Sequence, residues 1–255
     1  MCKLTDNKFI PCRNCPNRSK GGPMLGYYYD KLNGFDIVKE CDCHRKWRLE
    51  QEFNRELILS NINPDYTLDN YVGTKSINDI EALKTILMYP DKFIYKKMIY
   101  IYGPNGCQKT TMCQALGKEL IKKGYSVQYQ TMNEIITALV QSFDDPNQEQ
   151  KDYLIQRCSN CDFLIIDESF DIKKVTLYNS GFQIPFLDNF IRSRFDINKK
   201  TIIFISNKKQ DMIAKEGFGA SMESLIERNT RQSTLFFNDA WVENANKIDR
   251  FGLFK

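Results

Sequence analysis

The chain is organised by one segment, Met98-Ile-Tyr-Ile-Tyr-Gly-Pro-Asn-Gly-Cys-Gln-Lys-Thr-Thr111. An apolar run typical of a buried strand leads into a turn that contains glycine, and apolar residues at helical spacing follow it. Strand, glycine turn and helix in this order are the context of the phosphate-binding loop G-x-x-x-x-G-K-S/T, whose backbone N–H groups surround phosphates. The segment therefore predicts a nucleotide-binding site.

The loop departs from its pattern at one position. Gly103, Lys109 and Thr110 have the expected spacing, whereas Gln108 stands where the pattern has its second glycine. If that position needs a left-handed backbone, a side chain there costs about 1–2 kcal/mol. Gly106 remains within the loop, so we expect Gln108 to affect catalytic efficiency more than the fold.

Two further strand ends carry polar side chains. The apolar run 163–166 ends in Asp167 and Glu168, the Walker B arrangement, in which one carboxylate serves the magnesium shell and the next a water molecule. The apolar run 201–206 ends at Asn207. The predicted nucleotide-binding residues are Gly103, Pro104, Asn105, Gly106, Cys107, Gln108, Lys109, Thr110, Thr111 and Asp167.

Strands and helices alternate on both sides of the loop. Besides the strand that enters the loop, the pattern predicts strands at 125–131, 163–167, 201–206 and 234–237. Apolar residues at helical spacing predict helices near 45–62, 80–87, 112–120, 135–143 and 184–191. This alternation predicts an α/β fold with a mostly parallel, five-stranded sheet flanked by helices.

Length and composition set limits on function. With 255 residues the chain can build one large domain or two smaller ones. A net charge of +4 permits a nucleic-acid partner but does not demonstrate one. No apolar run approaches the length of a membrane span, and residues 1–8 have no hydrophobic signal core, so we expect a cytoplasmic protein without a membrane partner.

Cysteines cluster near the N-terminus. The odd total of nine in an intracellular nucleotide binder argues against a disulfide framework and favours metal ligation. Residues 1–44 are too few to build a core, and a tetrahedral Zn²⁺ would supply folding energy. Cys2 or His44 could replace one ligand. The predicted zinc ligands are Cys12, Cys15, Cys41 and Cys43.

The helix predicted after this segment ends at Asn63-Pro64-Asp65, where proline breaks the periodicity. We therefore expect a zinc-binding module with its linker helix at 1–62 and an ATPase domain at 63–255.

The chain resembles AAA+ ATPases, and more narrowly the DnaC/DnaI-type helicase loaders, a group that includes IstB-like transposition ATPases. The resemblance covers nearly the whole chain and suggests a phage or mobile-element origin. Its motifs are Pro11-Cys-Arg-Asn-Cys15 with Cys41-Asp-Cys43, Asn61-Ile-Asn-Pro-Asp-Tyr66, Thr67-Leu-Asp-Asn-Tyr71, Asp167-Glu168, Phe190-Ile-Arg-Ser-Arg-Phe195 before Thr201, and Leu225-Ile-Glu-Arg228.

The resemblance implies ATP hydrolysis with Mg²⁺ held by Thr110 and Asp167. The resemblance implies four catalytic residues. Lys109 would contact the β- and γ-phosphates, and Glu168 would polarise the attacking water. Asn207 would position that water or sense the γ-phosphate, and Arg228 would act as a finger supplied by a neighbouring subunit. Arg231 competes with Arg228 for that last role.

The implied function is that of an ATP-dependent helicase loader in DNA replication. Such a protein would assemble as a homo-oligomeric ring or spiral on single-stranded DNA, and its zinc module would grip a replicative DNA helicase. Two alternatives stay open. One is a transposition-helper ATPase, and the other is a nucleotide-dependent adaptor in which Gln108 slows turnover.

Two other groups of residues are notable for their cysteines or their positive charge. Cys158 and Cys161 precede a strand and are expected to be buried thiols. A set of basic residues is predicted either to line a path for single-stranded DNA or to form a solvated face. These residues are Arg192, Arg194, Lys199, Lys200, Lys208 and Lys209.

Overall fold

The computed structural model describes residues 9–11, 26–32, 35–73, 75–140, 148–176 and 181–238. The chain divides into two compact units, Met1–Glu56 and Leu57–Lys255. The first contains an antiparallel hairpin of β1 (Tyr27–Leu32) and β2 (Phe35–Glu40), followed by the start of helix α1 (Asp42–Leu59).

The second unit is built on a five-stranded sheet. Its strands are β3 (Met98–Tyr102), β4 (Val127–Thr131), β5 (Phe163–Asp167), β6 (Thr201–Ser206) and β7 (Thr234–Phe236). They run parallel in the order β4-β5-β6-β3-β7, which confirms the predicted α/β class and parallel sheet. The helices are α2 (Ile77–Met88), α3 (Lys109–Lys122), α4 (Met132–Val140), α5 (Gln148–Asn160), α6 (Gln183–Arg192) and α7 (Ala220–Thr230).

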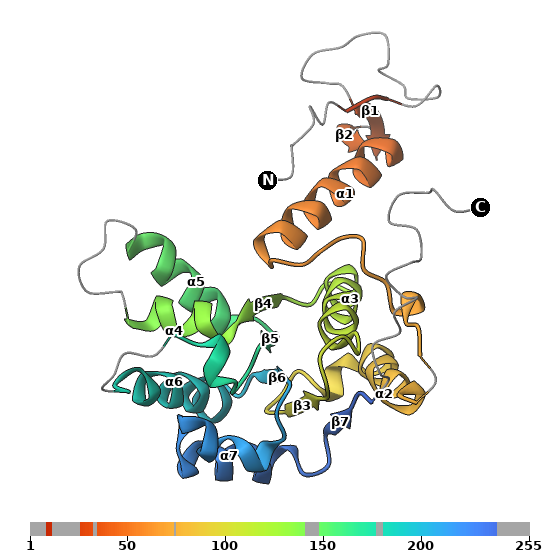
Figure 1. Ribbon diagram of the computed structural model, residues 1–255. Helices are drawn as coiled ribbons and strands as arrows, with labels where there is room; N and C mark the ends of the chain where they lie inside the picture. The colour runs from red at the N-terminus through yellow and green to blue at the C-terminus, as the bar shows by residue number, and fades with distance from the viewer. Residues whose placement is uncertain are drawn as a thin grey trace, which may run out of the picture. The chain divides into compact units, whose positions relative to one another are not determined.

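Helices cover both faces of this sheet. Successive strand residues point to opposite faces, and the even-numbered ones, such as Tyr100, Leu164 and Phe204, join a core with α4, α6 and α7. Helices α2 and α3 lie on the other side, where α3 packs against β4 and β5 (Figure 1). The sheet is therefore buried on both faces, which explains its nearly continuous apolar strands.

Arg194 is a buried structural residue. Its side chain is 0% exposed, and its guanidinium donates to the carbonyls of Cys158 (2.6 Å) and Cys161 (2.9 Å) at the end of α5 and to that of Thr201 (2.7 Å) in β6. The last carbonyls of a helix have no intrahelical donor, so Arg194 caps α5 and ties it to the sheet. Both alternatives predicted for Arg194, a DNA path and a solvated face, are wrong, because the side chain is fully buried.

Three other members of that basic set form ion pairs. Arg192 contacts Asp188 (2.8 Å), Lys200 contacts Asp162 (2.8 Å), and Lys208 contacts Glu216 (2.6 Å). These pairs favour the interpretation of a solvated, internally paired face.

Cys158 and Cys161 are buried thiols, as predicted. Burial raises the pKa of the Cys158 thiol to about 12 and also raises the pKa of Cys161. Both thiols therefore stay protonated near neutral pH and are poor nucleophiles and metal ligands.

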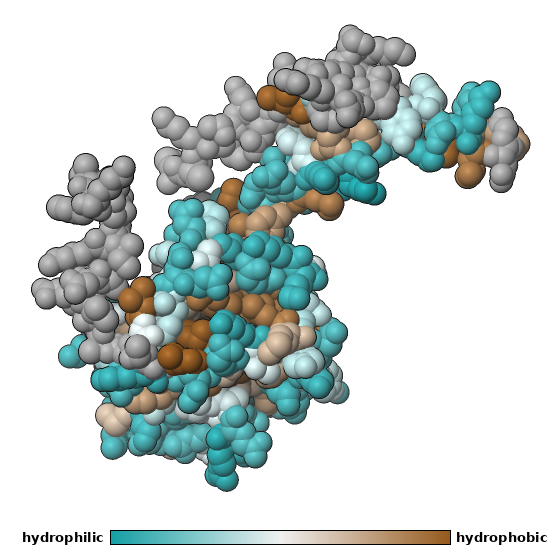
Figure 2. All heavy atoms as spheres, turned by 90° about the vertical axis from the view of Figure 1, so that its right-hand side faces the viewer, coloured by the Kyte–Doolittle hydropathy of each residue, from teal (hydrophilic) through white to brown (hydrophobic). Residues whose placement is uncertain are grey.

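Figure 2 views the molecule from the side on which α2 and α3 lie and shows apolar atoms exposed within a mainly hydrophilic surface. Ile77 and Met88, at the two ends of α2, are among the exposed apolar side chains. Within the described part of the chain, no helix is long and apolar enough to cross a membrane.

Candidate nucleotide-binding site

The turn between β3 and α3 begins with a glycine that the tertiary structure requires. Gly103 has φ +153°, and a Cβ atom built there would lie 2.0 Å from the carbonyl oxygen of Phe237. Phe237 is fixed next to the turn, because its N–H donates to the carbonyl of Tyr102 (2.9 Å). A side chain at position 103 would force these two backbone segments apart.

Gln108 adopts the left-handed backbone that glycine usually fills, with φ 64° and ψ 15°. Its side chain also makes a specific contact, since Oε1 accepts a hydrogen bond from the N–H of Val72 (3.0 Å). The left-handed backbone of Gln108 destabilises the fold by about 1–2 kcal/mol. The hydrogen bond with Val72 offsets about 0.5–1.5 kcal/mol of this. The residue that departs from the motif therefore links the loop to the segment before α2.

That segment is held along α3 by two further side chains. The N–H of Asn63 donates to Oε1 of Gln114 (3.0 Å), and Nζ of Lys118 donates to the carbonyl of Pro64 (2.7 Å). Each contact uses a backbone atom of residues 63–72. These hydrogen bonds therefore fix the path of the segment, and they do not depend on which side chains it carries. We call residues 63–73 the connector.

Lys109 is almost fully buried and points back into the loop. Its Nζ donates to the carbonyls of Gly103 (2.8 Å) and Pro104 (2.8 Å) and to Oδ1 of Asn207 (3.0 Å). A strand end 98 residues further along the chain therefore meets the loop lysine. The ammonium lies at the start of α3, where the helix dipole also favours a bound anion.

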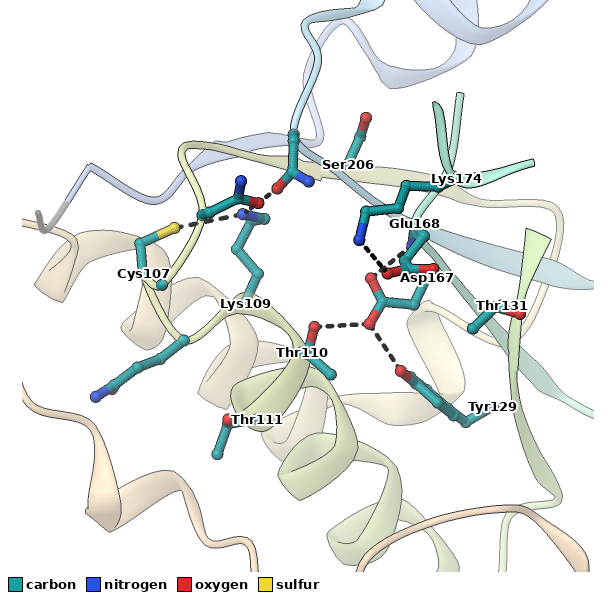
Figure 3. A pocket seen from close by; sticks show the side chains of 14 residues that line it. Cys107, Lys109, Thr110, Thr111, Tyr129, Thr131, Asp167, Glu168, Lys174 and Ser206 are labelled. Carbon is teal, nitrogen blue, oxygen red and sulfur yellow. Dashed lines mark hydrogen bonds and ion pairs between the residues drawn. The ribbon is translucent and has the colours of Figure 1, made fainter. Parts of the chain in front are cut away.

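Asp167, at the end of β5, is buried opposite the start of α3. Its Oδ2 accepts from the hydroxyl of Thr110 (2.6 Å) and from the phenol of Tyr129 (2.7 Å), while Oδ1 accepts from the N–H of Glu168 (2.7 Å) (Figure 3). Mg²⁺ prefers hard oxygen ligands and bound water, so a hydroxyl and a carboxylate in contact fit its chemistry.

Glu168 has a left-handed backbone, with φ 52°, and its Oε1 lies 3.2 Å from Nζ of Lys174. Non-glycine residues in this region cost about 1–3 kcal/mol and concentrate at functional sites. The side chain of Glu168 is aimed at the pocket, where Lys174 contacts it (Figure 3).

These residues surround a cavity of about 490 Å³, within the usual range for small-molecule sites. Gly103 and Pro104 do not line it, but their carbonyls accept hydrogen bonds from Lys109, which does. Arg228 on α7 and Arg231 just after that helix are exposed, and neither lines this cavity. The lining consists of Asn105, Gly106, Cys107, Gln108, Lys109, Thr110, Thr111, Tyr129, Thr131, Asp167, Glu168, Lys174, Ser206 and Asn207.

Sequence reasoning missed four of these residues. Tyr129 lies in the middle of β4 and Thr131 at its end. Lys174 ends a short 3-10 helix after β5, and Ser206 is the last residue of β6. Because β4 pairs with β5 in register, with Thr131 opposite Asp167, odd-numbered residues of β4 share a face with Asp167. Strand alternation would have identified Tyr129 and Thr131 if the order of the strands had been known.

Two of the four predicted zinc ligands, Cys41 and Cys43, are among the residues that the structure describes. Cys12, Cys15 and the alternative Cys2 lie outside the described residues. The sulfur atoms of Cys41 and Cys43 are 3.0 Å apart, a pair of soft donors that suits Zn²⁺. Among the described residues, no group of three or more potential ligands forms, so zinc stays a prediction. The His44 ring instead contacts Glu40 (2.6 Å) and packs on aromatic rings.

Replacing Gln108 by glycine should remove strain and one hydrogen bond together, so we expect the unfolding free energy to change by less than about 1 kcal/mol. The Val72 amide should exchange with solvent faster, because its acceptor is gone. Hydrogen exchange by mass spectrometry measures this directly. Gln108→Leu is the matched control, because it keeps the strain without the acceptor, and it should be less stable than Gln108→Gly. Equal exchange at Val72 in the wild type and both variants would contradict the contact.

Comparison with known proteins agrees with this geometry. Residues 62–226 match the family model of the bacterial DnaA ATPase domain. The chromosomal replication initiator protein DnaA of Aliarcobacter butzleri is 29% identical over 119 residues, covering 47% of this chain and 26% of the relative. DnaA of Campylobacter jejuni (strain 81-176) is 27% identical over 217 residues, covering 78% of this chain and 46% of the relative. The chain thus spans less than half the length of these relatives.

Solved structures share the fold. AMPPCP-bound DnaA from Aquifex aeolicus aligns with a TM-score of 0.55 and 22% identity over 69% of this chain and 51% of that one. A DnaC helicase loader aligns with a TM-score of 0.52 and 15% identity over 69% of this chain and 98% of that one. The sheet and its helices therefore share the fold of these two solved structures.

Proposed function

Because the chain belongs to the family of the bacterial DnaA ATPase domain, we propose that it is an ATPase of DNA replication that acts as a helicase loader. One observation carries the ATPase part of the proposal. Lys109 and Thr110 of the loop, Asp167 and Glu168 of β5, and Asn207 after β6 converge on one cavity. This is the set that phosphoryl transfer to water needs.

Each residue has a role that its position supports. Backbone N–H groups of the loop and of the first turn of α3 face the phosphates. When nucleotide binds, the ammonium of Lys109 exchanges its hydrogen bonds with the carbonyls of Gly103 and Pro104 for contacts with the β- and γ-phosphate oxygens. Glu168 accepts a proton from the attacking water, and Asn207 positions that water or senses the γ-phosphate.

Thr110 and Asp167 would hold Mg²⁺, the first through its hydroxyl and the second through a bound water. When bound, Mg²⁺ neutralises charge on the phosphate oxygens. Arg228 is exposed and does not line its own cavity, as expected of a residue that reaches the nucleotide of a neighbouring subunit. Hydrolysis would then depend on assembly.

The loader role rests on the N-terminal unit and on the likeness to a DnaC helicase loader. The unit is separate from the ATPase core, and its paired sulfurs at Cys41 and Cys43 suit a small zinc module that binds another protein. Residues 1–62 would contact a replicative helicase, and residues 63–255 would assemble on single-stranded DNA as a ring or spiral.

The test uses the full chain, a purified bacterial replicative helicase and single-stranded DNA. With ATP, the wild type should retain the helicase on the DNA. Lys109→Ala should retain at least about ten-fold less helicase, because an uncompensated phosphate charge weakens nucleotide binding. Sedimentation of the complex measures it. Lys122→Ala, which changes an exposed lysine of the same helix, is the control. Retention that does not depend on ATP or on Lys109 would contradict the proposal.

A second candidate is an initiator-type ATPase that acts on DNA without carrying a helicase, which the match to DnaA favours. It predicts ATP-dependent DNA binding with no helicase retained. The transposition helper would instead retain a transposase on duplex DNA. An adaptor slowed by Gln108 would bind ATP and partners but release no phosphate, and Gln108→Gly would restore turnover.

A further inference from the structure

Tyr129 is a tyrosine whose hydroxyl reaches the nucleotide cavity from the edge strand of the sheet. It lies in the middle of β4, opposite Ile165 of β5, and is 8% exposed. Because Tyr129 and Asp167 are on the same face of two paired strands, the phenol extends along that face to the carboxylate (Figure 3). This geometry needs both strands in their observed register.

The hydroxyl completes the contacts of Asp167. Oδ2 accepts from Tyr129 on one side (2.7 Å) and from Thr110 on the other (2.6 Å), and Oδ1 accepts from the N–H of Glu168 (2.7 Å). An ionised carboxylate offers about four acceptor positions. These three described donors leave about one position on Oδ1, and they fix the orientation of the carboxylate plane.

The contacts that hold Tyr129 in its strand do not involve its hydroxyl. The backbone N–H of Tyr129 donates to the carbonyl of Ser60 (3.0 Å), and the strand pairs with β5 through its main chain. Neither contact uses the phenol oxygen. A phenylalanine would therefore keep the strand and the ring in place and remove one donor from Asp167.

We propose that Tyr129 is a positioning residue for the divalent cation of this site. It holds the Asp167 carboxylate so that its remaining acceptor position meets a metal-bound water while Thr110 offers its hydroxyl oxygen. Outer contacts of this kind commonly change metal affinity 10–100-fold when they are removed. The inference rests on the proposed function, because it assumes a nucleotide with a divalent cation.

The test compares the wild type with Tyr129→Phe in the full chain. Mn²⁺, which replaces Mg²⁺ and is visible by electron paramagnetic resonance, is titrated in the presence of AMPPCP. We expect the Kd for Mn²⁺ to rise about ten-fold in Tyr129→Phe. Binding of AMPPCP in excess EDTA should be unchanged, because Tyr129 contacts no loop N–H group in the described structure.

Tyr125→Phe is the matched control. Its hydroxyl also donates to an aspartate, Asp91, over 2.7 Å, but Tyr125 and Asp91 lie outside the cavity lining. It should leave the Kd for Mn²⁺ unchanged.

The outcomes separate the two proposals. A wild type that binds Mn²⁺ with AMPPCP, together with the same Kd in Tyr129→Phe, would overturn the positioning role alone. A melting temperature that falls in Tyr129→Phe without any change in the Kd for Mn²⁺ would also overturn it, since only a packing role would remain. A wild type that binds neither AMPPCP nor Mn²⁺ would overturn the proposed function and this inference with it.

Discussion

Glu168→Gln should lower the rate of ATP hydrolysis at least about 100-fold while nucleotide binding is retained, because removal of a general base typically costs 10²–10⁴ in rate. Glu168 has a left-handed backbone, and the residue lines the cavity. The glutamine amide has the same shape as the carboxylate but accepts no proton. Phosphate release with and without single-stranded DNA and helicase measures the rate, and binding of a fluorescent ATP analogue measures retention.

Glu216→Gln is the control for this prediction. Glu216 also pairs with a lysine, Lys208 (2.6 Å), but it does not line the cavity, so turnover should stay near the wild-type rate. If Glu168→Gln hydrolyses ATP as fast as the wild type, Glu168 is not the base. If the wild type is also inert and Gln108→Gly is active, the adaptor alternative is favoured.

The same variant tests whether Arg228 acts across an interface. Glu168→Gln and Arg228→Ala would each be inactive alone, but a mixture should regain activity. Some interfaces would then combine an intact Glu168 with an intact Arg228 from the neighbour. The same mixture made with Arg231→Ala shows which arginine acts. Mixtures that stay as inactive as their components would exclude a finger supplied in trans.

Arg194→Met should lower the unfolding free energy by about 3–5 kcal/mol, because each buried carbonyl left without its donor costs about 1–3 kcal/mol. The substitution leaves the carbonyls of Cys158, Cys161 and Thr201 without this donor in the interior. Urea unfolding of the full chain, followed by far-ultraviolet circular dichroism, measures the change.

Arg192→Met provides the comparison two residues away. Arg192 is partly exposed and pairs with Asp188 at the surface, so its loss should cost at most about 1 kcal/mol. A loss of affinity for single-stranded DNA in Arg194→Met, with wild-type stability, would reinstate the alternative that the burial of Arg194 contradicts.

Local patterns were enough to predict much of the fold. The apolar runs of β5 and β6 are continuous because both faces of those strands are buried, and their predicted ends agree with the structure. Helix α5 was missed because its sequence, QEQKDYLIQRCSN, is mostly polar and carries a weak apolar stripe. Hairpin β1–β2 was missed because both of its faces mix apolar and charged residues.

The candidate site was also only partly predictable from the sequence. The loop, Asp167, Glu168 and Asn207 could be placed together from sequence because each follows a strand, and the carboxyl ends of parallel strands meet at one edge of a sheet. The contact of Gln108 with Val72 joins residues 36 apart, and that of Tyr129 with Asp167 joins residues 38 apart. Such contacts depend on strand order, register and the path of the connector. Those features follow from packing across the whole unit, which periodicity within one segment does not specify.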